Sequence, residues 1–294
     1  MPLAAAPRSS VFFTRVARSR QRLLDRTYKR DKDGKFASGG GGVRDSLARA
    51  TTIGELNAAT AAEAKRITGR DTHVDMAGAD LEVAKELNEG VLRGMEHTPS
   101  TRLDSIETYG RGGARKARDD EDGGEYANAR GAVDDGGETP TYQLGFSTTW
   151  VGNPTKLRES MADDAKTQAG GGPGSVGGKH GPMSIGVHEF GHVASSQVPS
   201  THERVTYHVS GRELDRYKVD VEFEAQDRVH AIVEERTGSP YGNNQENPRS
   251  VIGREVSSYA SWERGELTAE AFADVVLNGD KASSLSHDIY DMVT

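Results

Sequence analysis

The chain has 294 residues, of which 34% are hydrophobic and 28% are charged, and it contains no cysteine. Without cysteine there are no disulfide bonds and no thiolate ligands, so a metal site must be built from histidine and carboxylate. No segment approaches the roughly 18 apolar residues of a membrane-spanning helix, so the sequence predicts a soluble protein without a membrane span.

The charge is unevenly distributed along the chain. Residues 1–42 contain ten Lys or Arg and three Asp or Glu, a net charge of +7, which leaves −15 on residues 43–294. The first segment ends in four consecutive glycines, which favour a flexible joint. We therefore expect a basic flexible arm and glycine linker over 1–42. Such an arm could contact nucleic acid, a membrane surface or an acidic partner, or be a solvated tail.

Part of this arm carries a recognisable pattern. From Asp31 to Gly40 the chain reads Asp-Lys-Asp-Gly-Lys-Phe-Ala-Ser-Gly-Gly. This segment resembles an Asp-x-x-Gly-Lys/Arg-Phe-x-Ser-Gly-Gly pattern of tailed-phage head and portal-associated proteins. The resemblance implies a phage origin, contacts of residues 1–42 with phage structural proteins, and a location in the virion or in the bacterial cytoplasm.

The middle of the chain is predicted to contain both helices and strands. Leu81, Ala84, Leu87, Val91 and Met95 recur at helical spacing and predict one buried stripe. The predicted elements are helices over Ile53–Ile67, Leu81–Met95 and Pro154–Gln168, strands over 103–109 and Tyr142–Val151, and a solvated, Gly- and Asp-rich loop over 111–139.

The C-terminal part is predicted to contain three helices. Leu267, Ala271 and Val275 would form the buried stripe of the last predicted helix. These expectations describe an α+β fold with a helix-and-sheet lobe over 43–183, a helical lobe over 184–294 and a cleft between the lobes. The predicted helices run from Ser184, as N-cap, to before Pro199, over Glu213–Arg236, and over Glu266–Leu277 with a stop at Asn278-Gly279.

Two histidines four residues apart indicate the chemistry. The segment His188-Glu189-Phe190-Gly191-His192 lies in a predicted helix, where residues i and i+4 point to the same side. Both imidazoles can therefore bind one metal ion, while Glu189 stays free to accept and return a proton. This H-E-x-x-H spacing is typical of zinc peptidases.

A catalytic zinc ion needs a third protein ligand. The position six residues after His192 is Val198, so a third histidine is excluded there and a carboxylate on another helix is expected. Glu266, Glu270 and Asp274 are spaced four residues apart and share one helix face. Stacked carboxylates on a largely apolar helix repel one another, so a metal ion with its histidines would stabilise them.

The histidine segment and residues 257–277 together resemble the gluzincin zinc metallopeptidases, particularly the catalytic domain of anthrax lethal factor and its phage-borne relatives. In that family the zinc-binding Glu lies seven residues after a catalytic Tyr, and a further acid follows four residues later. The resemblance implies a zincin-like fold and one Zn²⁺ bound by His188, His192 and Glu266. It also makes Tyr259 the oxyanion-stabilising tyrosine and Glu270 the acid that orients a histidine.

A second register of the acidic helix stays open. Thermolysin-like gluzincins use Glu-x-x-x-Asp, which would make Glu270 the third ligand and Asp274 the acid behind it. The spacing from Tyr259 favours Glu266 as the ligand.

The resemblance predicts a zinc-dependent endopeptidase acting on a protein or peptide substrate. Zinc lowers the pKa of a bound water to about 7, Glu189 takes the proton, and Tyr259 stabilises the oxyanion. The strand over 142–151 is expected to be the edge that pairs with an extended substrate. The alternative is a virion structural or binding protein that keeps the scaffold without using it, and this alternative has no need of Glu189.

Overall fold

The structure is a computed structural model. By its internal contacts the chain divides into residues 1–42 and 43–294, and the sheet and the candidate site lie in the second unit. The predicted basic arm falls outside the described residues, except for its last two glycines. None of the helices in the described segments is long and apolar enough to cross a membrane. The described residues are 41–110, 126–133, 140–167, 180–198, 227–239, 246–261 and 264–294.

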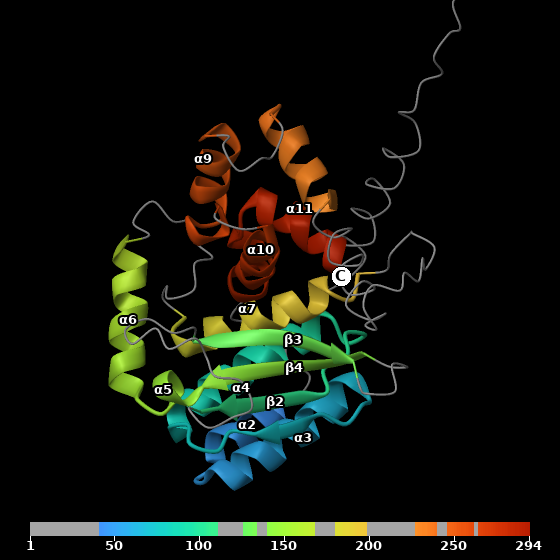
Figure 1. The fold of residues 1–294 in the computed structure, drawn as a ribbon. Coiled ribbons are helices and arrows are strands. Elements are labelled where there is room, and N and C mark those ends of the chain that lie inside the picture. Colours follow the sequence, from blue (N-terminus) through green and yellow to red (C-terminus); the bar gives the residue numbers. More distant parts are fainter. Residues whose placement is uncertain are drawn as a thin grey trace, which may run out of the picture. The chain divides into compact units, whose positions relative to one another are not determined.

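Residues 43–294 form an α+β fold that is mostly helical and contains one small mixed sheet (Figure 1). The elements are α2 (Gly41–Arg49), α3 (Ile53–Thr68), β1 (His73–Asp75), α4 (Leu81–His97), β2 (Ser105–Tyr109), β3 (Ala127–Val133), β4 (Pro140–Ser147), α5 (Thr148–Val151), α6 (Pro154–Thr167), α7 (Pro182–Ser195), a helix over 227–237, α9 (Glu246–Glu255), the 3₁₀ turn η1 (Tyr259–Ser261), α10 (Arg264–Asn278), the 3₁₀ turn η2 (Gly279–Lys281) and α11 (Ser284–Val293). Since α2 begins at Gly41, the last two glycines of the predicted linker are helical.

The helices α3 and α4 form where the sequence predicts them. Thr52 caps α3 through its hydroxyl, which accepts a hydrogen bond from the N–H of Glu55 (3.2 Å), and Gly69 ends the helix with φ = 72°. Asp80 caps α4 by accepting two backbone hydrogen bonds of 3.1 Å. The predicted stripe of α4 is buried except at Leu81, which is partly exposed.

The four strands form one sheet in the order β1-β2-β4-β3. Strands β1, β2 and β4 are parallel, and β3 runs antiparallel to β4 with Ala129 opposite Leu144. Because β3 lies within 111–139, the predicted loop is wrong over that strand. Its sequence, Ala-Asn-Ala-Arg-Gly-Ala-Val, lacks the β-branched and aromatic run that marks a strand, so its pairing with β4 determines its conformation.

Strand β4 is shorter than predicted and is not an edge. It ends at Ser147, and the next four residues form α5 instead of continuing the strand to Val151. It lies between β2 and β3, so both of its sides are already hydrogen-bonded. The prediction that this strand offers its edge to a substrate is therefore wrong. Among the described strands, β1 and β3 are the edges.

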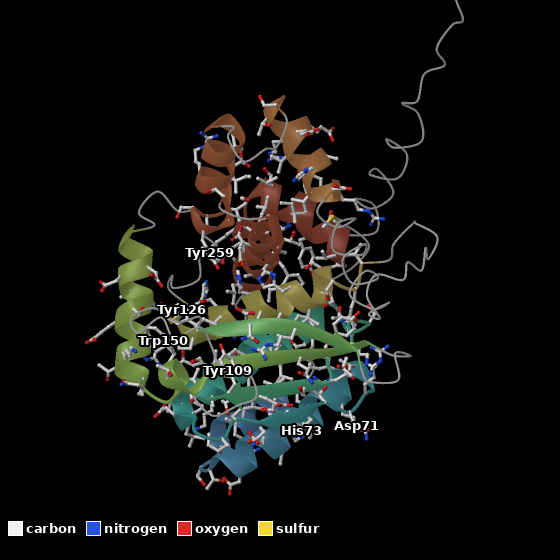
Figure 2. All side chains as sticks on the ribbon, in the orientation of Figure 1. Asp71, His73, Tyr109, Tyr126, Trp150 and Tyr259 are labelled. Atoms are coloured by element: carbon white, nitrogen blue, oxygen red, sulfur yellow. The ribbon has the colours of Figure 1, made fainter. Side chains whose placement is uncertain are left out.

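An aromatic contact fixes the start of β3. Trp150 of α5 is buried, and its ring lies edge-on to Tyr126, with 4.9 Å between centroids (Figure 2). The Lys156 ammonium lies 4.2 Å from the centroid of the Trp150 ring. The Tyr126 hydroxyl donates a 2.6 Å hydrogen bond to Asp164 of α6. The residue preceding β3 is therefore attached to both α5 and α6.

Helix α7 packs so closely on α4 that no side chain fits between the backbones. A Cβ atom on Gly186 would lie 2.2 Å from the carbonyl oxygen of Leu87, and one on Gly90 would lie 2.2 Å from that of Met183. Such distances are far inside van der Waals contact, so both positions require glycine. The contact holds α7 against the core that α4 forms with the sheet.

Replacing Gly186 by alanine is expected to destabilise the protein by about 2–3 kcal/mol, because the two helices must separate. Helix propensity alone predicts the opposite sign, since Ala stabilises a helix interior over Gly by about 1 kcal/mol. Gly54→Ala in α3 is the matched control, because a Cβ there meets nothing within 4 Å. Denaturant unfolding measures both variants. Wild-type stability of Gly186→Ala would rule out the close contact.

The C-terminal helices build a second hydrophobic core. Leu267 and Ala271 of α10 are buried in it with residues of α9, α11 and the helix over 227–237, whereas Val275 belongs to the first core. The predicted buried stripe of α10 is therefore confirmed, and this helix joins the two cores. Helices α9 and α11 were not predicted. The predicted helix Glu213–Arg236 is described only from residue 227 onward.

A partly buried histidine links α4 to α11. The Nδ1 atom of His97 lies 2.8 Å from the hydroxyl of Tyr290, whose ring stacks on Phe272 of α10 with 5.6 Å between centroids. Burial, and to a smaller extent the charge of Arg93, lower the pKa of His97 from 6.5 to about 4. The imidazole is therefore neutral in the folded protein at pH values where an unfolded chain is protonated.

Acid is expected to destabilise the protein through His97. As the pH falls from 6.5 toward 4, the unfolded chain takes up a proton that the folded protein excludes, so the free energy of unfolding decreases by up to about 3 kcal/mol. His97→Asn should lose less stability over this range, as measured by denaturant unfolding at several pH values. The variant His73→Asn, at an exposed position of β1, controls for a general effect of removing histidine. Parallel curves for His97→Asn and the wild type would contradict the assignment.

Candidate metal centre

Helix α7 carries both histidines and begins three residues earlier than predicted. Its N-cap is Gly181, with φ = 57°, and Pro182 takes the first helical position. Ser184, the predicted N-cap, lies in the first turn, where its hydroxyl donates to the Gly181 carbonyl (2.7 Å). The positive φ requires glycine at the cap, and proline fits the first turn because its missing N–H would have no partner there. The histidines thus sit on a helix with a well-defined start.

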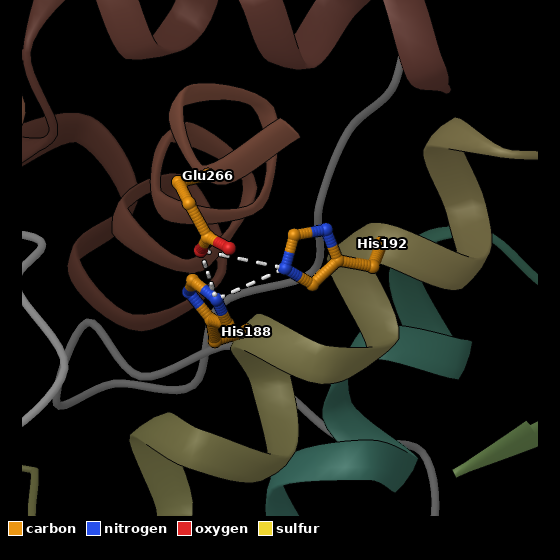
Figure 3. A group of neighbouring side chains, drawn as sticks. All are labelled: His188, His192 and Glu266. Carbon is orange, nitrogen blue, oxygen red and sulfur yellow. Dashed lines mark hydrogen bonds and ion pairs between the residues drawn. The ribbon is translucent and has the colours of Figure 1, made fainter. Parts of the chain in front are cut away.

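Three side chains from two helices converge on one point (Figure 3). The Nε2 atoms of His188 and His192 are 3.2 Å apart. The Oε2 atom of Glu266, on α10, lies 3.0 Å from the first nitrogen and 3.5 Å from the second. Each residue therefore contributes one ligand atom to a nearly equilateral triangle that could hold a metal ion.

The triangle has the size that zinc requires. Ligand atoms held about 2.0–2.1 Å from a tetrahedral zinc ion lie about 3.4 Å from one another, close to the three observed distances. Glu266 Oε2 is buried and has no hydrogen-bond partner among the described residues, although two imidazole nitrogens face it. A cation would compensate this burial. Two imidazoles and one carboxylate are also the donor set of many catalytic zinc sites.

Two of the three ligand side chains are partly exposed to solvent. The side chain of His188 is 5% exposed, whereas those of His192 and Glu266 are 24% and 19% exposed. A structural zinc site is closed by four protein ligands, whereas a catalytic one keeps a position for water or substrate. A set of three ligands, two of them partly exposed, therefore fits the open arrangement better than the closed one.

Glu270 supports the histidine from the opposite side. One helical turn after Glu266, its fully buried carboxylate lies with Oε1 2.8 Å from His188 Nδ1. If Nδ1 donates its proton to Glu270, then Nε2 is left with a lone pair that points at the triangle. Metal-binding histidines commonly have such a carboxylate partner, which fixes the ring and raises its basicity.

Asp274 lies one turn further along α10 and has a different role. One of its oxygens accepts a 2.8 Å hydrogen bond from the side-chain amide of Asn278, and the other accepts a 2.9 Å bond from the N–H of Ser283, the N-cap of α11. The first bond lies within α10, whereas the second joins α10 to the start of α11. These contacts agree with Glu266 as the third ligand and Glu270 as the acid behind it. They do not support Glu270 as the ligand with Asp274 behind it.

The charges of the centre are strongly coupled. Burial alone would raise the pKa of Glu266, but the imidazoles of His188 and His192 lower it far below its usual range. Burial alone would lower the pKa of His188, but the carboxylates of Glu266 and Glu270, assisted by Glu189, raise it well above 6.5. Several carboxylates around one imidazole therefore make this position attractive to a cation.

The remaining two predicted residues lie beside the triangle. Tyr259 belongs to η1, and its ring centroid is 6.0 Å from that of His188. Partial burial and the carboxylates of Glu266, Glu189 and Glu270 raise the pKa of Tyr259, so its hydroxyl keeps its proton at neutral pH. Glu189 is buried and follows His188 on α7.

Two residues near the metal centre, Ser257 and Gly191, were not identified from the sequence. Ser257 is buried, and its hydroxyl accepts a 2.9 Å hydrogen bond from the N–H of Ala260, which fixes the turn that carries Tyr259. A serine preceding a short helical turn is a signal for such a cap. Gly191 contacts the backbone of α10. Its place in the histidine segment gives no indication of that contact, which depends on tertiary packing.

Comparisons of the chain with protein families, with curated proteins and with solved structures found no match.

Proposed function

We propose that this protein is a zinc-dependent endopeptidase of the gluzincin type. The observation that carries the proposal is the convergence of His188 Nε2, His192 Nε2 and Glu266 Oε2 within 3.5 Å of one another. Helices α7 and α10 bring these atoms together from segments more than 70 residues apart in the sequence. The proposed ligands are these three residues, and the proposed substrate is a protein or peptide.

In the proposed reaction, His188, His192 and Glu266 hold one zinc ion, and Glu189 moves the proton. When bound, zinc would polarise the scissile carbonyl and lower the pKa of a water molecule to about 7. Glu189 accepts the proton of the attacking water and passes it to the leaving amine. Glu270 keeps His188 oriented through Nδ1.

Tyr259 is proposed to stabilise the charge that develops on the carbonyl oxygen. Because partial burial and the nearby carboxylates raise the pKa of Tyr259, its hydroxyl stays protonated at neutral pH and can donate a hydrogen bond. The residue is 38% exposed, so a substrate can reach it. We assign the pairing of an extended substrate to β3, the edge strand in contact with α7, in place of β4.

The proposal is tested on the full-length protein by metal analysis and by cleavage of an unbiased peptide library. We expect about one zinc per chain, peptide cleavage that a zinc chelator abolishes, and recovery when zinc is restored. Folded protein that binds no zinc would refute the proposal. Zinc binding without cleavage of any peptide would favour the alternative of a virion structural or binding protein that retains the scaffold.

A further inference from the structure

We propose that Gly191 is a positioning residue of the metal centre. It provides no ligand atom, but by lacking a side chain it lets α10 approach α7 closely enough for Glu266 to reach the two histidines. This inference rests on the proposed zinc site and adds a determinant of its geometry.

Gly191 meets α10 mainly at its backbone. A Cβ atom built on Gly191 would lie 3.0 Å from the Cα of Ala269, 3.2 Å from the carbonyl oxygen of Ala269 and 3.2 Å from the Cβ of Phe272. None of these atoms can rotate away, because all belong to the backbone or to the first side-chain carbon. A methyl group at this position therefore requires the two helices to separate by a few tenths of an ångström.

The separation would change two sides of the ligand triangle. The 3.2 Å distance between His188 and His192 is internal to α7 and does not depend on α10. The distances of 3.0 and 3.5 Å to Glu266 both cross from α7 to α10. Metal–ligand distances tolerate deviations of only about 0.2 Å, so the expected separation is as large as this tolerance. Gly191 thus controls how well Glu266 completes the site.

Gly265 is a matched control on the other helix. It directly precedes Glu266, and a Cβ atom there would lie 3.9 Å from Cε1 of His192, an ordinary van der Waals distance. The same substitution, glycine to alanine, is thus sterically harmless next to the proposed ligand. Leu56→Ala in α3 serves as a second control, since it opens a cavity in the core without widening the contact between α7 and α10.

The experiment compares full-length wild type, Gly191→Ala, Gly265→Ala and Leu56→Ala under conditions where each is folded. Zinc affinity is measured by competition with a chromogenic chelator, and ligand geometry by the absorption spectrum of the Co²⁺-substituted protein. We expect Gly191→Ala to bind zinc about 10-fold more weakly and to alter the Co²⁺ spectrum. Gly265→Ala and Leu56→Ala should match the wild type in both measurements.

Two results would overturn the inference, and they differ from each other. If the wild type binds zinc but Gly191→Ala has the same affinity and the same Co²⁺ spectrum, the positioning role is wrong and the proposed function stands. If the wild type binds neither metal, the proposed function fails and the inference fails with it. Should Gly191→Ala not fold, Ala269→Ser, which enlarges the α10 residue whose backbone faces Gly191, is measured instead with the same expectation.

Discussion

Replacing Glu189 by glutamine is expected to leave the zinc content of the protein unchanged and to slow peptide hydrolysis by about 10³-fold. Glutamine has nearly the same size, so the buried position beside His188 stays filled. It cannot accept a proton from water, so the step assigned to Glu189 is lost. Single-turnover cleavage of a fluorogenic peptide, together with metal analysis of the same preparation, measures both quantities.

The control for this variant is Glu82→Gln, at an exposed position in the first turn of α4 whose carboxylate pairs with Lys85. It should cleave at the wild-type rate. If Glu189→Gln also cleaves at that rate, Glu189 is not the general base. If it loses its zinc, Glu189 maintains the metal site instead of moving a proton.

The second large effect is expected at the third ligand. Glu266→Gln should weaken zinc binding by at least about 100-fold, because it removes the one negatively charged ligand while leaving both imidazoles in place. Glu270→Gln should weaken binding by about 10–100-fold, as expected when a carboxylate that orients a ligand is lost. Competition titration with a zinc chelator measures all of these affinities.

Asp274→Asn completes this series because it separates the two registers of α10. With Asp274 bonded to Asn278 and Ser283, the change should reduce stability but leave zinc affinity at the wild-type value. The reverse pattern, with a large loss of affinity at Glu270 and Asp274 and a small one at Glu266, would establish the thermolysin-like register.

The sequence predicts those elements of the fold whose residues repeat with a clear period. Helices α4 and α10 were predicted because apolar residues recur on one side, and Asn278-Gly279 was expected to end α10. The structure brings together the three predicted ligands, and their placement follows from the i, i+4 geometry of each helix. Convergence of the two helices was expected from the need for a third ligand and from the resemblance to gluzincins, because neither helix shows it in its own pattern.

The elements that were missed depend on tertiary contacts. Strand β3 has small and polar residues, and it is a strand because β4 supplies its hydrogen bonds. The substrate edge was assigned to the wrong strand for the same reason, since strand order cannot be obtained from one strand's pattern. The glycine contacts of α7 are also invisible in the sequence, because Gly186 and Gly191 face different helices at distances that only the packing determines.

A structure of the zinc-loaded protein, with anomalous diffraction recorded at the zinc absorption edge, tests the central claim most directly. We expect one strong anomalous peak about 2 Å from His188 Nε2, His192 Nε2 and Glu266 Oε2, with Glu270 on His188 Nδ1. A peak bound by other residues, or none at this position in protein shown to contain zinc, would contradict the account.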